Sequence, residues 1–380
     1  MKFIHLSDLH IGKRVNEYSL AEDQEYIFDQ ILEIIKNQDP DAVIIAGDIY
    51  DKSVPPTEAV GQLDRFLYKL YELPFKTFLI SGNHDSAERV AFGAKIFEHN
   101  GIYFSPAYNG KISPIVMNDE YGEVNVYLLP FIKPSHVKSA FKDEADRIVT
   151  YTDAVKIAVK HMNVDESKRN IIVSHQFVTG AKTSEGSEIC VGGTENVNCE
   201  AYSPFDYAAL GHIHTAQNIN GISHIRYCGT PLKYSFSETQ GKTVTVVELK
   251  QKGEPPIISE IPLKPLRDMR TIKGSLNELC NIDLSSYDYV RVILSDEIEI
   301  PGALAKLRTY YPNIMEMKYS NRNSSSDELE FDGDTIESKS PIELFSLFFE
   351  QQNGRKLRDE EAAFMTKIIE SAEEEQNASY

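Results

Sequence analysis

The chain has 380 residues, of which 41% are hydrophobic and none is tryptophan, and this is compatible with a globular protein of two or three domains. Its net charge of −19 argues at first sight against a nucleic-acid partner. The stretch from Ser326 to Tyr380, however, carries 15 acidic and 5 basic side chains, so more than half of the excess lies in a tail. A nucleic-acid substrate is therefore not excluded.

The sequence has no feature of an exported or membrane-inserted protein. No hydrophobic run approaches the roughly 20 residues that span a bilayer. Met1-Lys2-Phe3 leads directly into a predicted strand, which leaves no room for a signal peptide. The four cysteines lack a paired metal-binding spacing, and we expect them to be reduced. We therefore expect a cytoplasmic protein without membrane contact.

Strands and helices are predicted to alternate from the N-terminus. A strand at 3–6 and a strand at 42–46 flank an amphipathic helix that includes Ile27, Ile31 and Ile35. The later predictions are a helix with Leu63, Phe66 and Leu67 on one face, a strand at 77–80, a helix at 87–99, a strand at 124–129, a helix at 152–161, a strand at 171–174, a loop at 180–203 and strands at 207–210, 222–228 and 243–249. This order predicts an α/β fold with a largely parallel or mixed sheet and helices on its faces.

Proline-rich and acidic stretches divide the chain into three predicted domains. The first covers 1–260, and prolines mark the linker that follows it. A small α+β domain is predicted at 265–335 and ends in a polar, acidic segment. Helices with aromatic and aliphatic side chains are predicted in a C-terminal segment at 340–375, and these side chains need a partner surface.

Polar side chains follow five of the predicted strands at their carboxyl ends. They are Asp8 and His10, then Asp48, then Asn83 and His84, then His175, and finally His212 and His214. Open α/β sheets place their sites just beyond such strand ends, so we expect these side chains to converge. Asp, Asn and His without thiolates favour a catalytic divalent-metal site over structural zinc.

Seven of these residues are candidate ligands, which is more than a single ion with open positions needs. We therefore expect two ions that share a carboxylate, for which Asp48 on a central strand is the best candidate. His84 remains as the group that acts on the leaving oxygen, and Asp51 is expected to orient its ring. Asp85 is expected only to cap a helix.

The motifs Asp8-Leu9-His10, Gly47-Asp48, Gly82-Asn83-His84, His175 and Gly211-His212-Ile213-His214 resemble, in number and order, those of the calcineurin-like metallophosphoesterases. Within that superfamily the chain resembles the bacterial SbcD nucleases, in stretches that extend to Glu238. The resemblance implies a mixed-sheet sandwich of the metallophosphoesterase type flanked by helices, with a small α+β cap domain and C-terminal helices. It also implies two divalent ions, Mn²⁺ or Mg²⁺.

The resemblance further implies a role for each part of the chain. Asp8, His10, Asp48 and His214 would hold one ion, and Asp48, Asn83, His175 and His212 would hold the other. The activity would be 3′→5′ double-strand exonuclease and single-strand endonuclease cleavage of DNA, in repair, recombination or replication near the bacterial nucleoid. The chain would form a homodimer, for which the Leu63, Phe66 and Leu67 face is a candidate. The cap would contact DNA, and the final helices would dock on the ATPase SbcC.

Two other functions stay open on the sequence alone. The same scaffold could serve a phosphatase or phosphodiesterase for protein or small phosphoesters, although such an enzyme has no need for the added C-terminal half. A non-catalytic scaffold that recruits an ATPase is the second alternative, and loss of cleavage in a His84→Ala variant that still binds metal would argue against it.

Overall fold

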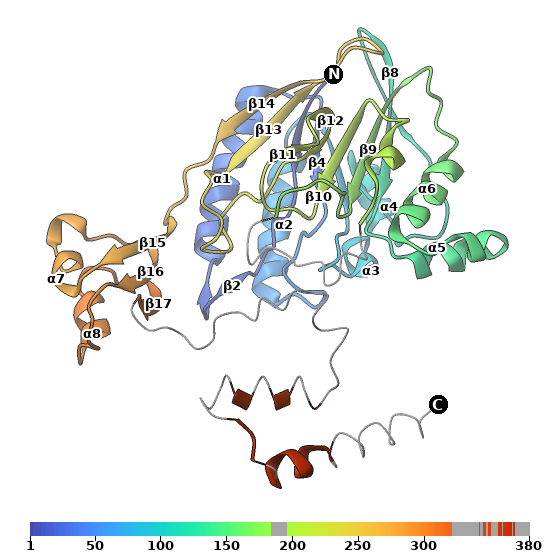
Figure 1. The fold of residues 1–380 in the computed structure, drawn as a ribbon. Coiled ribbons are helices and arrows are strands. Elements are labelled where there is room, and N and C mark those ends of the chain that lie inside the picture. The colour runs from blue at the N-terminus through green and yellow to red at the C-terminus, as the bar shows by residue number, and fades with distance from the viewer. Residues whose placement is uncertain are drawn as a thin grey trace. The chain divides into compact units, whose positions relative to one another are not determined.

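A computed structural model describes residues 1–183 and 196–320, together with 342, 345–346, 349–350, 356–358, 360–366 and 368. Two six-stranded mixed sheets form its main body (Figure 1). The first sheet has the order β14 (Ile257–Pro262), β13 (Thr243–Glu248), β1 (Lys2–Leu6), β4 (Ala42–Ala46), β5 (Lys76–Ile80) and β6 (Ile102–Phe104). Strands β1, β4, β5 and β6 run parallel, whereas β13 is antiparallel to β1.

The second sheet also has four parallel strands. Its order is β11 (Gln217–Ile219), β12 (Ile222–Tyr227), β10 (Tyr207–Gly211), β9 (Arg169–His175), β8 (Gly122–Leu129) and β7 (Ile115–Asp119). The four strands β12, β10, β9 and β8 are parallel, and an antiparallel strand lies at each edge. Side chains from both sheets, among them Phe3, Phe78 and Val173, form one buried cluster between them. The two sheets therefore pack as a sandwich.

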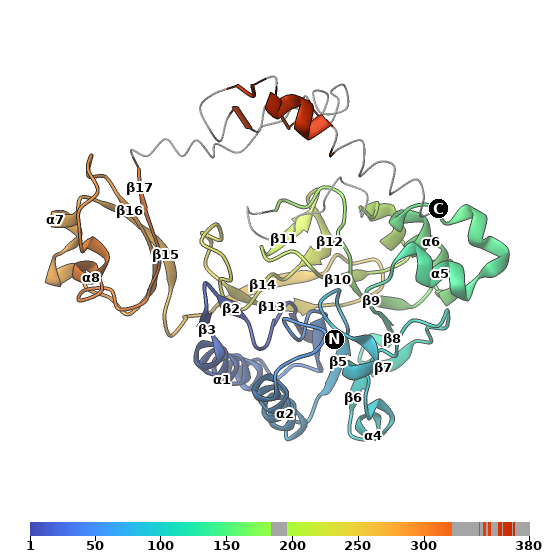
Figure 2. The same ribbon diagram turned by 90° about the horizontal axis from the view of Figure 1, so that it is seen from below.

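Helices cover the outer faces of the sandwich. Figure 2 shows α1 (Ala21–Gln38) and α2 (Thr57–Tyr71) side by side, and their apolar faces pack on the first sheet. On the second sheet, α6 (Tyr151–Met162) packs with α5 (Pro134–Ala140). The sandwich of mixed sheets with flanking helices confirms the predicted fold class.

The predicted helix at 87–99 is wrong as a single element. The structure has two short helices there, α3 (Ala87–Val90) and α4 (Ala94–Glu98). Gly93 lies between them with a φ of 76°. A left-handed residue cannot continue an α-helix, so the helix restarts in a new direction.

The remaining elements are short. They are β2 (Arg14–Val15), β3 (Tyr18–Ser19), the 3₁₀ turns η1 (Lys142–Arg147), η3 (Cys199–Tyr202) and η4 (Ile282–Leu284), the strands β15 (Met269–Gly274), β16 (Tyr289–Leu294) and β17 (Ile314–Tyr319), and the helices α7 (Leu276–Leu279) and α8 (Ala303–Leu307). Strands β15, β16 and β17 form a three-stranded sheet in that order. Among the described residues, no helix is long and apolar enough to cross a membrane.

The chain divides into two compact units. One comprises residues 1–272, 285–292 and 308–316, and the other comprises 273–284, 293–307 and 317–380. The sequence predicts C-terminal helices at 341–349 and 359–373. Half of these residues lie outside the described part of the chain, and the described ones, 342, 345–346, 349, 360–366 and 368, are helical. The middle of the predicted loop at 180–203 also lies outside them.

Candidate metal centre

The loops after β1 and β4 run side by side at the carboxyl edge of the first sheet. Asp8 N donates to Gly47 O and His10 N to Asp48 O, each at 3.0 Å. Asp8, His10 and Asp48 have φ values of 52°, 44° and 48°, a conformation that L-residues seldom adopt. Such strain is found where a function requires a particular side-chain direction, and it occurs here at four predicted ligands, the fourth being His212 with a φ of 105°.

One set of ligand atoms is formed by Asp8, His10 and His214, whose atoms all lie within 4.8 Å of one another. The Nε2 atoms of His10 and His214 are 3.2 Å apart. Asp48 Oδ2 lies 3.8 Å from His10 Nε2. Ligand atoms from residues of both sheets therefore converge on one site.

A second set is formed by Asp8, Asp48 and His175, within the same distance of one another. His175 Nε2 lies 3.3 Å from Asp48 Oδ2. Asn83 Oδ1 lies 3.0 Å from His175 Nε2 and 3.0 Å from His212 Nδ1. His212 is thus placed in the centre beside Asn83, and its backbone N–H donates to Asp8 Oδ1 at 3.0 Å.

The centre is buried and rich in opposing charges. Burial raises the pKa of Asp8 and lowers that of His10 well below its ordinary value. Burial also disfavours the charged form of His175, but the negative charge of Asp48 outweighs this and raises its pKa to about 9. Two buried carboxylates beside converging imidazole nitrogens fit the donor set of a divalent cation, which would balance their charge. The residues present therefore fit a divalent-metal site.

The Nδ1 atoms of several rings meet oxygen atoms outside the centre. His175 Nδ1 lies 2.8 Å from the carbonyl of Ala46, and because a carbonyl can only accept, Nδ1 carries the proton. His214 Nδ1 lies 3.2 Å from Glu238 Oε1. In both rings Nε2 is left to face the centre, as metal-binding histidines require.

His84 lies beside the centre, with its ring centroid 5.0 Å from that of His10. Its backbone N–H donates to Asp48 Oδ1 at 2.9 Å, and its Nδ1 lies 2.9 Å from the main-chain carbonyl of Asp51. Asp51 thus contacts His84 through its backbone. The Asp51 carboxylate instead pairs with Lys13 Nζ at 2.7 Å.

Asp85 does not cap α3, contrary to the expectation from sequence, because Ser86 is the N-cap residue. The Asp85 carboxylate accepts hydrogen bonds from the N–H groups of Ile49, Tyr50 and Gly82 at 2.9–3.0 Å. It therefore joins the loop that carries Asp48 to the loop that carries Asn83. Burial and the charge of Asp48 raise the pKa of Asp85 to about 6.

Two glycines allow these loops to approach each other. A Cβ atom on Gly82 would lie 2.1 Å from Asp48 Oδ1, and one on Gly47 would lie 2.4 Å from His175 Nδ1. Gly47 also has a φ of 86°. Any side chain at either position would displace a predicted ligand.

The sequence analysis missed residues that hold the loop after β1. Gln24 Nε2 donates to the carbonyls of Leu9 and His10 at 3.1 and 2.8 Å, and Gln24 Oε1 accepts from Gly12 N at 3.1 Å. The Tyr234 hydroxyl also donates to Leu9 O. The sequence did contain one signal for Gln24. This residue lies three positions before Ile27 on the apolar face of α1, where a buried amide needs hydrogen-bond partners.

Comparison with known proteins gives two family matches. The model of calcineurin-like phosphoesterases matches residues 1–216, and a model described as type 5 capsule protein repressor C-terminal domain matches residues 265–353. The chain is 35% identical over 327 residues to the SbcD subunit of the SbcCD nuclease of Staphylococcus epidermidis, a match that covers 83% of this chain and 85% of that protein.

Solved structures with a related fold are more distant. A dimetal phosphatase from Danio rerio is 11% identical with a TM-score of 0.38, over 68% of this chain and 95% of that one. An archaeal phosphodiesterase is 12% identical with a TM-score of 0.30, over 68% of this chain and 100% of that one.

Proposed function

The chain belongs to the calcineurin-like phosphoesterases and, within them, to the family of SbcD nucleases, and we propose that it is the nuclease subunit of an SbcC–SbcD-like complex. It is a metal-dependent phosphodiester hydrolase, and its substrate is DNA. The proposed reactions are 3′→5′ double-strand exonuclease and single-strand endonuclease cleavage in repair, recombination or replication. One observation carries the proposal. Ligands from both sheets meet in a buried centre, where Asp8 belongs to both sets described above and Asp48 also belongs to a third set, with His10 and His84.

We propose two ion positions that share Asp48. Asp8, His10, Asp48 and His214 would hold one ion, and Asp48, Asn83, His175 and His212 would hold the other. When bound, a pair of divalent ions activates water and stabilises charge on the phosphate. Several imidazole nitrogens among the ligands favour Mn²⁺ over Mg²⁺, because Mg²⁺ prefers an all-oxygen environment.

His84 is proposed to donate a proton to the leaving oxygen. The Asp51 carbonyl lies at Nδ1 and orients the ring, so Nε2 is the atom that transfers the proton. Asp51 is therefore proposed to act through its backbone. The backbone N–H of His84 binds Asp48, which couples the position of this ring to a proposed metal ligand.

The experiment supplies the protein with Mn²⁺ and either labelled duplex DNA or p-nitrophenyl phosphate. We expect metal-dependent release of nucleotides from DNA. We also expect His84→Ala to bind metal normally and to lose about 10²–10⁴-fold in kcat. His99→Ala, a change at an exposed histidine outside the centre, is the matched control. Hydrolysis of the monoester with intact DNA would refute the nuclease proposal.

The homodimer remains a proposal, but its expected surface is wrong. Leu63, Phe66 and Leu67 are at most 8% exposed and belong to the core under α2. Next to Leu67 on α2, Tyr68 and Tyr71 are 59% and 50% exposed and line a hollow of about 310 Å³. We propose that this surface pairs with a second copy. Tyr71→Glu should then convert a dimer to a monomer in analytical ultracentrifugation, and an unchanged dimer would refute the surface.

The C-terminal segment is proposed to bind the ATPase partner. In the described part of this segment, Phe364 is 65% exposed and Ile368 is 45% exposed, four positions apart. Such a pair forms an apolar stripe suited to a partner helix. Removal of the chain after Ser340 should abolish binding of an SbcC-like ATPase in a pull-down and retain basal nuclease activity. Retained binding would show that the ATPase docks elsewhere. The proposed domains remain 1–260, 265–335 and 340–375, with the middle one as the DNA-contacting cap.

A further inference from the structure

Glu238 lies directly behind a proposed metal ligand. It is 4% exposed, and its Oε1 lies 3.2 Å from His214 Nδ1. The backbone N–H of Tyr234 also donates to Oε1, at 3.2 Å. The hydroxyl oxygen of Thr230 lies 3.4 Å from the other carboxylate oxygen. This carboxylate is therefore held in one orientation from several sides.

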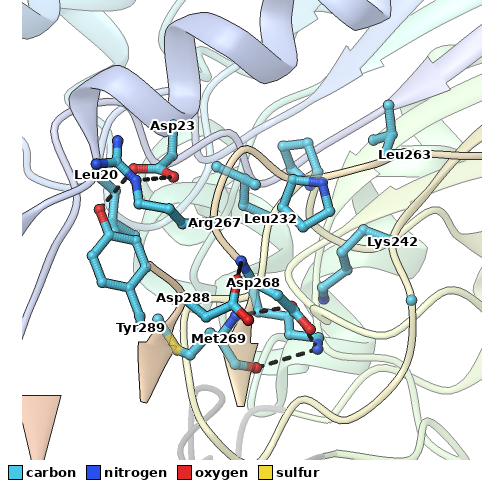
Figure 3. Close-up of a pocket in the computed structure, with 14 residues that line it drawn as sticks. Leu20, Asp23, Leu232, Lys242, Leu263, Arg267, Asp268, Met269, Asp288 and Tyr289 are labelled. Carbon is cyan, nitrogen blue, oxygen red and sulfur yellow. Dashed lines mark hydrogen bonds and ion pairs between the residues drawn. The ribbon is translucent and has the colours of Figure 1, made fainter. Parts of the chain in front are cut away.

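Lys242 fixes the same carboxylate and the same histidine. Its Nζ donates to Glu238 Oε2 and, at 2.8 Å, to the main-chain carbonyl of His214. Figure 3 shows Lys242 among the side chains that line a cavity of about 350 Å³ with Leu232, Leu263 and Met269. The lysine side chain is 11% exposed, and its ammonium group is directed to Glu238 and His214. A buried ion pair of this kind specifies geometry more than it adds stability.

The effect on His214 follows from the two nitrogens of its ring. With Nδ1 bonded to a carboxylate, the proton is held at Nδ1 and the Nε2 lone pair faces His10. His175 has a neutral carbonyl, that of Ala46, in the equivalent place. A carboxylate makes its imidazole the more basic ligand of the two. The two ion positions therefore differ in the group that contacts Nδ1 of the histidine, which is a carboxylate for His214 and a main-chain carbonyl for His175.

We propose that Glu238, anchored by Lys242, is a positioning residue that sets His214 as a ligand and so controls occupancy of only one of the two ion positions, the one with Asp8 and His10. This rests on the proposed function, since it takes the centre to hold two ions. The position with His175 does not depend on Glu238, because its histidine is oriented by the main chain.

The test is metal binding by the metal-free full chain. Wild-type protein titrated with Mn²⁺ should bind two ions, with the spin-coupled electron paramagnetic resonance signal of a close pair. In Glu238→Ala we expect one ion to bind as before and the other to bind about 10–100-fold more weakly, with loss of the coupled signal. Glu238→Gln keeps an acceptor for Nδ1 and should recover part of that affinity.

Asp119→Asn is the matched control. Asp119 is also a carboxylate with little exposure, 7% for its side chain, and it is paired with Arg169 and the terminal amine of Met1. In the described part of the chain it contacts no predicted ligand. This variant should bind both ions with wild-type affinity even if its thermal midpoint falls.

Two results would overturn the proposal. One is wild-type affinity for both ions in Glu238→Ala. The other is an equal loss at both positions together with a lower thermal midpoint of the metal-free protein, which would indicate only a structural role. If Glu238→Ala does not fold, Glu238→Gln decides by the same criteria. A wild-type protein that binds two ions but leaves DNA intact would refute the nuclease function and leave this proposal standing.

Discussion

Three histidines of the centre direct one ring nitrogen to an oxygen atom that orients the ring, and the other nitrogen is available to the centre. His84, His175 and His214 each direct Nδ1 to an oxygen atom, two of them to main-chain carbonyls. The main chain cannot be removed by substitution, so these two orientations depend on the loops and not on particular side chains. His214 alone depends on a replaceable carboxylate, that of Glu238.

Asp51→Ala tests whether the main chain orients His84. The substitution removes the ion pair with Lys13 but keeps the carbonyl that lies 2.9 Å from His84 Nδ1. We expect kcat on DNA to fall clearly less than in His84→Ala, when both are measured with saturating Mn²⁺. A loss in Asp51→Ala as large as in His84→Ala would show that the carboxylate itself is required.

His5 gives the fold a pH dependence that has nothing to do with catalysis. It is fully buried between the sheets, and its Nδ1 lies 3.0 Å from the Tyr207 hydroxyl. Burial, with the charge of Arg226, lowers its pKa to about 3. The unfolded chain binds a proton at about pH 6.5 and the folded chain does not, so this contribution to stability is complete above pH 6.5 and is lost as the pH falls toward 3.

His5→Phe should therefore flatten the acid side of the stability curve. Between pH 7.5 and pH 5, wild-type protein should lose about 2 kcal/mol more free energy of unfolding than the variant, measured by urea denaturation. An identical loss in both proteins would show that His5 is protonated in the folded state.

At the scale of elements, α2 shows how an amphipathic helix divides its side chains. Phe66 is 2% exposed and stacks on Phe28 of α1 with a centroid distance of 4.7 Å, whereas Tyr68 on the other side is 59% exposed. Sequence periodicity identified the apolar face correctly but could not tell whether it meets the core or a second copy. The structure assigns it to the core.

Phe66→Ala and Tyr68→Ala should separate the two faces. We expect Phe66→Ala to lower the free energy of unfolding by about 3–5 kcal/mol, because it leaves a cavity between α1 and α2. Tyr68→Ala should change it by no more than about 0.5 kcal/mol. Chemical denaturation measures both, and similar losses in the two variants would contradict this division.

The sequence predicted the strand ends well and their surroundings poorly. Hydrophobic runs that end in Asp, Asn or His can be read locally, and strand order then brings Asp8, Asp48 and His175 together. The contacts of Gln24, Asp85 and Glu238 could not be predicted in this way, because they depend on how loops that are distant in the sequence pack together. The break at Gly93 was also missed, since apolar spacing continues across it.

At the scale of the whole molecule, the centre joins two sheets that also share an apolar interior. Asp8, Asp48 and Asn83 follow strands of the first sheet, and His175, His212 and His214 follow strands of the second. An ion held by both groups binds the folded chain and not the unfolded one, so it stabilises the sandwich as a unit.

Removal of metal should therefore lower the thermal midpoint of the whole first unit. With free Mn²⁺ at 100 times its Kd, each site should add about 2.7 kcal/mol to the free energy of unfolding. Differential scanning calorimetry with and without a chelator measures this. A midpoint that does not respond to Mn²⁺ would show that no ion bridges the sheets.

The place of β1 in its sheet has a consequence for synthesis of the protein. The strand Lys2–Leu6 is paired on one side by β13, whose residues Thr243–Glu248 leave the ribosome long after it. At about 5–20 residues per second, that edge stays unpaired for roughly 12–48 s. His212 and His214 also appear only near the end of this interval, so a nascent chain cannot cut nucleic acid. During the same interval it carries an open apolar strand edge that can pair with other chains.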